Sequence, residues 1–128
     1  MNALSKWWMI AVIALCGCNQ NSPDNGLPAT PLFTGVENLN YVEGGKLIEE
    51  RLRRQFPAGS SARQLSEYLE TQGLRGEPGR RNSGGNEGVA SLRFGASFCG
   101  SQVRVSWVAD AANQLQSLDV LYGDTGCP

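Results

Sequence analysis

The chain has 128 residues, a formal net charge of −1 and no histidine. This length allows one small domain with short extensions, and a nearly neutral charge does not favour nucleic acid as a partner. Without histidine, the chain cannot form the catalytic triads and metal centres that use imidazole. We therefore expect no metal and no cofactor.

The N-terminus combines one positive charge with a short apolar run. Lys6 precedes the run from Trp7 to Leu15. A basic start, a short apolar stretch and small residues after it are typical of an export signal. The run is well short of the ~20 residues that a helix needs to cross a bilayer, so we do not expect a permanent transmembrane helix.

Two cysteines follow this run in the stretch Leu15-Cys16-Gly17-Cys18. The stretch resembles the bacterial lipobox, in which a leucine and two small residues precede an invariant cysteine. The resemblance implies that residues 1–17 are a signal peptide, that Cys16 leaves with it, and that Cys18 is acylated. A metal or redox role for this cysteine pair is disfavoured, because neither histidine nor another cysteine lies nearby in the sequence.

Acylation of Cys18 would make the membrane a partner of the chain. A single acyl chain holds a protein only marginally, whereas the several chains of the lipoprotein family anchor it permanently. The next residue is Asn19 and not aspartate. By resemblance to enterobacterial lipoproteins, this implies transfer to the outer membrane, with the protein facing the periplasm.

Residues 18–43 are rich in Asn, Pro, Gly and Thr and have no sustained periodicity. This composition predicts a flexible tether. Leu32, Phe33 and Val36 are its apolar exceptions. We expect them to dock onto the domain that follows; the alternative is a short adhesive segment for a partner.

A single domain is predicted over residues 44–128, and it opens with a helix that begins near Gly44. Charged pairs four residues apart, Glu49 with Arg53 and Glu50 with Arg54, support this helix. Pro57 and Gly59 end it. Its apolar face recurs at helical spacing and consists of Leu47, Ile48, Leu52 and Phe56.

A second helix is predicted after Ser61, which forms a capping box with Gln64. Its apolar face contains Leu65, Tyr68 and Leu69. Gly73 stands where a left-handed residue commonly ends a helix, and Leu74 is expected to fold back on the last turn.

The stretch from Arg75 to Gly88 is rich in Arg, Gly and Asn and predicts a solvated loop. A phosphate-binding loop would need Gly-Lys-Ser/Thr between a strand and a helix, and this stretch follows a helix. Three strands are predicted after it from the alternation of apolar and polar residues, at 89–94, 102–108 and 115–122. The fold class is therefore α+β, with two N-terminal helices packed on a three-stranded antiparallel meander.

The last two cysteines fall at one end of this predicted meander. Cys99 lies in the turn between the first two strands, and Cys127 follows the third. In an exported protein, we expect a disulfide between them. Catalytic thiols are the alternative, but the sequence supplies no histidine base.

The predicted sheet and the loop before it also carry a set of arginines. Arginine is frequent at binding hot spots because its guanidinium pairs with two oxygens at once. We expect these arginines to form a partner-binding surface for a carboxylate-bearing envelope protein; the alternative is that they only keep an exposed sheet soluble. The set consists of Arg75, Arg80, Arg81, Arg93 and Arg104.

Two helices followed by strands, with the stretch from Phe56 to Leu74, resemble the BamE/SmpA family of outer-membrane assembly lipoproteins and, more loosely, domains like the β-lactamase-inhibitor protein. The resemblance spans about residues 44 to 122. The family usually ends its second helix with Leu-Gly-x-Pro, where this chain has Gln72-Gly73-Leu74, and its characteristic sequence ahead of the first helix is missing. A shared fold does not carry function, so no binding residue is transferred.

We expect the chain not to be an enzyme, because neither histidine nor a Gly-x-Ser-x-Gly motif is present. A hydrolase with two carboxylates is the remaining catalytic alternative, but the acidic residues are predicted on solvated faces. The predicted function is that of a lipid-anchored accessory that binds or assembles an envelope complex. The alternative is a periplasmic inhibitor or immunity protein that blocks an enzyme.

Overall fold

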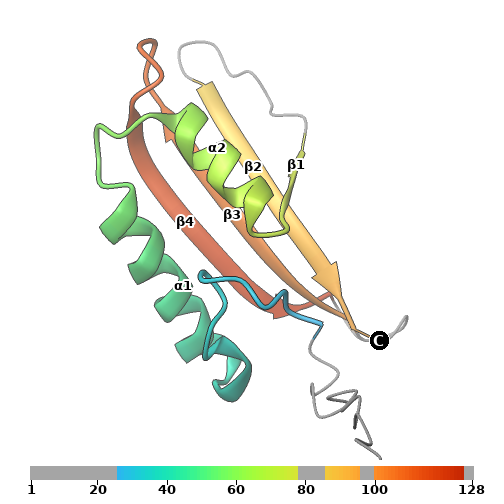
Figure 1. Cartoon of the computed structure of the whole chain (residues 1–128). Coiled ribbons are helices and arrows are strands. Elements are labelled where there is room, and N and C mark those ends of the chain that lie inside the picture. The colour runs from blue at the N-terminus through green and yellow to red at the C-terminus, as the bar shows by residue number, and fades with distance from the viewer. Residues whose placement is uncertain (1–25, 78–85, 96–99, 126–128) are drawn as a thin grey trace, which may run out of the picture.

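The structure is a computed structural model of the whole chain, and it describes residues 26–77, 86–95 and 100–125. Both described helices lie on one face of an antiparallel sheet with strand order β1-β2-β3-β4 (Figure 1). Helix α1 runs along β4, and α2 contacts β1 and β2. The elements are η1 (Val36–Asn38), α1 (Tyr41–Gln55), α2 (Ala62–Thr71), β1 (Arg75–Glu77), β2 (Asn86–Phe94), β3 (Ser101–Ala109) and β4 (Leu115–Asp124).

The α+β class and the two helices are confirmed, but the sheet has four strands and not three. The prediction of a loop from Arg75 to Gly88 is wrong at both ends. Arg75–Glu77 form β1 and pair with residues 89–91 of β2, which itself begins at Asn86. A strand of three residues is too short to show alternation, so only its pairing with β2 reveals it.

Helix α1 begins at Tyr41, earlier than the predicted start near Gly44. The side chain of Asn40 caps it by accepting a hydrogen bond from the backbone N–H of Glu43 at 2.9 Å. Gly44 lies inside the helix and is buried. A Cβ atom there would be only 2.7 Å from Cε1 of Tyr122. The glycine therefore permits close contact between α1 and β4, which a local sequence pattern does not reveal.

The predicted ends of α2 are confirmed. The Ser61 side chain accepts a hydrogen bond from the backbone N–H of Gln64 at 3.3 Å. Gly73 has φ of 100°, in the left-handed region. The N–H of Leu74 then donates to the carbonyl of Leu69 at 3.0 Å, which is the arrangement of a Schellman motif. This turn places the Leu74 side chain in the core.

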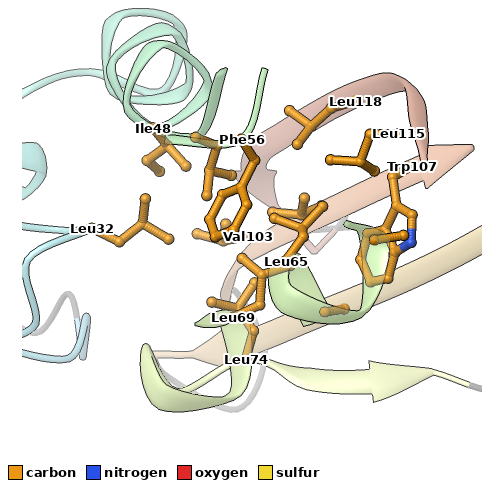
Figure 2. Packing of buried hydrophobic residues seen from close by; sticks show 14 of the residues in the cluster. Leu32, Ile48, Phe56, Leu65, Leu69, Leu74, Val103, Trp107, Leu115 and Leu118 are labelled. Carbon is orange, nitrogen blue, oxygen red and sulfur yellow. The ribbon is translucent and has the colours of Figure 1, made fainter. Parts of the chain in front are cut away.

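The core lies between the helices and the sheet, and Figure 2 shows how the side chains meet. Every apolar face predicted from the sequence contributes to it. Residues at the centre are fully buried, while those nearer the edges, such as Leu47 and Val120, are partly buried and pack against them. The fully buried members from helices and strands include Ile48, Leu52, Leu65, Leu69, Val103 and Val105.

Ion pairs on the helix surfaces, two of them predicted, add modestly to this packing. The pairs predicted on α1 form at 3.2 Å for Glu49–Arg53 and at 2.6 Å for Glu50–Arg54. Arg63 and Glu67 form a further pair at 3.1 Å on α2. Exposed pairs of this kind contribute little to folding free energy, typically ~0.3–0.5 kcal/mol on a helix.

The segment before α1 is part of the folded unit. Leu32, Phe33 and Val36 are almost fully buried, so their predicted docking is confirmed. The backbone of this segment is held as well. The N–H of Leu32 donates to the side-chain oxygen of Gln72 at 3.0 Å, and the Leu32 carbonyl accepts from Arg51 at 3.0 Å. The prediction of a flexible tether is therefore wrong for its described part: residues 26–40 pack on the domain, and residues 41–43 belong to α1.

Candidate functional site: the open face of the sheet

The face of the sheet opposite the helices is the candidate site. Alternate residues of each strand point to this side, because side chains alternate across a strand. In β3, for example, Arg104 and Val108 are exposed while Val103 and Val105 are buried. We call this surface the open face; its described positions are 75 and 77 in β1, 87–93 (odd numbers) in β2, 102–108 (even numbers) in β3 and 117–123 (odd numbers) in β4.

The strand register sorts the charges of the open face into two halves. One pair of cross-strand rows runs through Glu87–Val108–Ser117 and Glu77–Val89–Ser106–Asp119. The next two rows run through Arg75–Ser91–Arg104–Leu121 and Arg93–Gln102–Gly123. Acidic side chains thus occupy the first half and arginines the second. The formal charges of the open face sum to zero, but negative and positive charges are separated along the strand direction.

The two halves meet at an ion pair. Arg104 lies 3.5 Å from the carboxylate of Glu77, and the hydroxyl of Ser91 donates to the other oxygen of that carboxylate at 2.8 Å. Both charged side chains are close to half exposed. Glu77 is absent from the predicted set, which contained only arginines, and it reaches Arg104 through the pairing of β1 with β2.

The structure brings three of the five predicted arginines together. Arg75, Arg93 and Arg104 are exposed on neighbouring strands of the open face. Arg80 and Arg81 lie outside the described residues. The surface predicted for the five arginines is not purely basic, because acidic residues occupy the adjoining rows.

A shallow depression of about 330 Å³ lies in the acidic half, across β2, β3 and β4. Its walls include Glu87 and Asp119, which favour a group that carries positive charge or donates hydrogen bonds. Gly88, Trp107 and Leu118 also border it, although the side chains of their row face the helices. The open face therefore offers carboxylates on one half and guanidinium groups on the other, which suits recognition of a polar protein surface.

Two tyrosines on the helix side of the sheet have a raised pKa. Burial raises the pKa of Tyr122, and the neighbouring Tyr41 and Glu37 raise it further. Burial likewise raises the pKa of Tyr68, with Arg51 acting in the opposite direction. Within residues 26–77, 86–95 and 100–125, no three acidic or cysteine side chains gather as a metal ion would require.

The remaining predicted site residues, Cys18, Cys99 and Cys127, lie outside the described residues. Gly100, which follows Cys99, and Thr125, two residues before Cys127, are described and lie next to each other. The N–H of Thr125 donates to the carbonyl of Gly100 at 2.9 Å. Among the described residues, no helix is long and apolar enough to cross a bilayer.

No protein-family model, curated protein or solved structure matches this chain.

Proposed function

We propose that this chain is a lipid-anchored protein of the bacterial cell envelope that binds another protein through the open face of its sheet. The anchor is supported by the sequence alone, through Lys6, the apolar run from Trp7 to Leu15 and the lipobox-like stretch that ends at Cys18. Asn19 favours the outer membrane, with the domain facing the periplasm. The resemblance to the BamE/SmpA lipoproteins agrees with this location.

The observation that carries the binding role is the segregation of charge on an uncovered sheet face. The helices cover the other face of the sheet and form the core with it, so the open face remains for recognition. Arg75 and Arg93 are exposed beside the paired Arg104. Guanidinium groups on a rigid sheet can each take a carboxylate of a partner in a two-point contact at low entropic cost.

The proposed role is non-catalytic, because the chain has no histidine and the strongest charges of the open face are exposed. A disulfide between Cys99 and Cys127 belongs to the same proposal. Gly100 and Thr125 are hydrogen-bonded neighbours, so the chain ends that lead to these cysteines start close together. A periplasmic location would favour the oxidised state.

Two variants test this proposal in separate steps. Cys18→Ala should abolish labelling by radioactive palmitate and release the protein from membranes; unchanged labelling would overturn the anchor. The triple variant R75A/R93A/R104A should lose its partner in a pull-down from detergent-solubilised envelopes while it keeps the stability of the wild type. The matched control is R53A/R54A/R63A, which removes the same charge from the helix layer.

The pull-down also distinguishes the two classes of partner. An accessory of envelope assembly should recover membrane proteins, whereas an inhibitor should recover one dominant soluble enzyme. Equal recovery by the open-face variant and by the helix-layer control would show that the open face is not the binding site.

A further inference from the structure

One end of the domain gathers aromatic side chains around the point where the described chain begins. A Cβ atom on Gly26 would lie 2.9 Å from Cβ of Phe94, so the chain enters beside the end of β2. The ring of Phe94 is 6.5 Å from that of Tyr122, which meets Tyr41 edge-on at 4.9 Å. The Tyr41 hydroxyl shares a hydrogen bond of 2.7 Å with the side chain of Ser101.

The first turn of α1 exposes apolar surface at this same end. Val42 is 67% exposed and Tyr41 is 41% exposed, although both are large hydrophobic residues. The position of Tyr41 is well defined, since its ring packs on Tyr122 and its hydroxyl reaches β3. The exposed pair is therefore a fixed feature of the surface, close to where the chain enters the domain.

The docked N-terminal segment limits how far this end can stand from an anchor on Cys18. The contacts of Leu32 with Gln72 and Arg51 join the segment to both helices. Eight residue steps separate Cys18 from Gly26, where the described part of the chain begins. Eight residues span at most ~28 Å when fully extended, whereas a tether up to residue 43 would span ~85 Å.

We propose that Tyr41 and Val42 contact the lipid surface to which the chain is anchored. This inference rests on the proposed acylation of Cys18. A tyrosine with an apolar ring and a polar tip suits the interface between lipid and water, and Val42 adds apolar surface beside it. The short connection keeps this end of the domain near the bilayer and turns the opposite end, at residues 110–113, away from it.

The charges around the exposed pair select the kind of lipid. Glu37, Glu43 and Asp124 are exposed at this end, and Lys46 lies one turn after Val42 on α1. Among the described residues at this end, carboxylates outnumber the lysine, so anionic headgroups would be repelled. The surface therefore fits zwitterionic phospholipid.

A tryptophan reporter tests the contact directly. Variants V42W and A112W, each purified with its lipid, are placed in phosphatidylcholine vesicles with or without brominated acyl chains, which quench nearby indoles. Ala112 is exposed in the turn between β3 and β4 and is the matched control. Because β3 has nine residues, it separates the two sites by ~30 Å. Trp107 is buried and common to both variants.

We expect brominated lipid to remove about half of the added emission in V42W, as for an indole at the membrane interface, and to leave A112W unchanged. Admixed phosphatidylglycerol should reduce the quenching in V42W. Equal quenching in both variants, or none in V42W when mass spectrometry shows lipid on Cys18, would overturn the contact and leave the anchor intact. Absence of lipid on Cys18 would overturn the anchor and this inference together. Quenching undiminished by phosphatidylglycerol would overturn the preference for zwitterionic lipid.

Discussion

The indole of Trp107 occupies the space that a side chain on Gly88 would need. The two residues are cross-strand partners in β2 and β3, and a Cβ atom on Gly88 would lie 2.1 Å from Cε2 and Cζ2 of the ring. The indole therefore lies across its neighbouring strand and is almost entirely buried there. The buried position of this indole thus depends on the absence of a side chain at Gly88 on the adjacent strand.

Gly88→Ala should therefore destabilise the protein strongly. The new methyl group forces the indole out of its position, and overpacking of this kind costs about 3 kcal/mol of unfolding free energy. Urea denaturation followed by the fluorescence of Trp107 measures the loss.

Gly76→Ala is the matched control for this substitution. Gly76 is in β1, in the adjacent inward-facing row, and nothing lies within 4 Å of a Cβ atom there. Its unfolding free energy should stay within about 0.5 kcal/mol of the wild type. If both variants behave alike, the close approach of Trp107 to Gly88 does not exist in solution.

Gln72→Ala should release the N-terminal segment from the domain. Gln72 is only 6% exposed, and its side-chain oxygen accepts the N–H of Leu32 at 3.0 Å. A buried donor left without its acceptor costs about 2 kcal/mol. We expect lower stability, faster hydrogen exchange at Leu32 and earlier proteolysis between residues 27 and 36.

The exposed Gln55 at the end of α1 provides the control. Gln55→Ala removes the same side chain but keeps the acceptor of the Leu32 N–H on Gln72, so it should leave exchange at Leu32 unchanged. Protection at Leu32 that survives in Q72A would show that the apolar contacts alone hold the segment.

Non-reducing mass spectrometry of protein purified from the envelope should find Cys99 joined to Cys127. The closed loop contains 29 residues from Cys99 to Cys127, and a loop of that length contributes about 3.5 kcal/mol in the chain-entropy model. Reduction should lower the unfolding free energy by a similar amount. The double variant C99S/C127S should show the same loss and no further response to reductant. Two free thiols in the purified protein would refute the pairing.

Alkaline pH should weaken the fold through Tyr122 and Tyr68. Burial raises the pKa of both phenols above the ordinary value of 10.0. The folded chain then holds protons that the unfolded chain has already lost, so their stabilisation is complete below about pH 10 and is lost as pH rises through the folded-state pKa values. Stability measured by denaturation should fall above pH 10.

The variant Y68F/Y122F keeps both rings and removes both hydroxyls. Its stability should fall less steeply above pH 10 than that of the wild type. An identical slope in the two proteins would assign the alkaline loss to other groups.

The sequence by itself determined the helix faces, the ends of α2 and the inward positions of the three long strands. These features are local: a repeat of 3.6 or 2 residues identifies a buried face, and Ser61 and Gly73 end a helix by contacts within a few residues. The docking of Leu32, Phe33 and Val36 was also predictable, because apolar residues in a polar segment need cover.

Only the tertiary structure decided the features that depend on contacts between distant residues. Strand β1 is too short for a periodic pattern and exists because β2 offers it an edge. Gly44 lies within a helix at the point where Tyr122 packs closely against it. The register alone brings Glu77 to Arg104 and divides the open face into acidic and basic halves. Local patterns report which side of an element is buried, but the pairing of elements depends on packing across the whole domain.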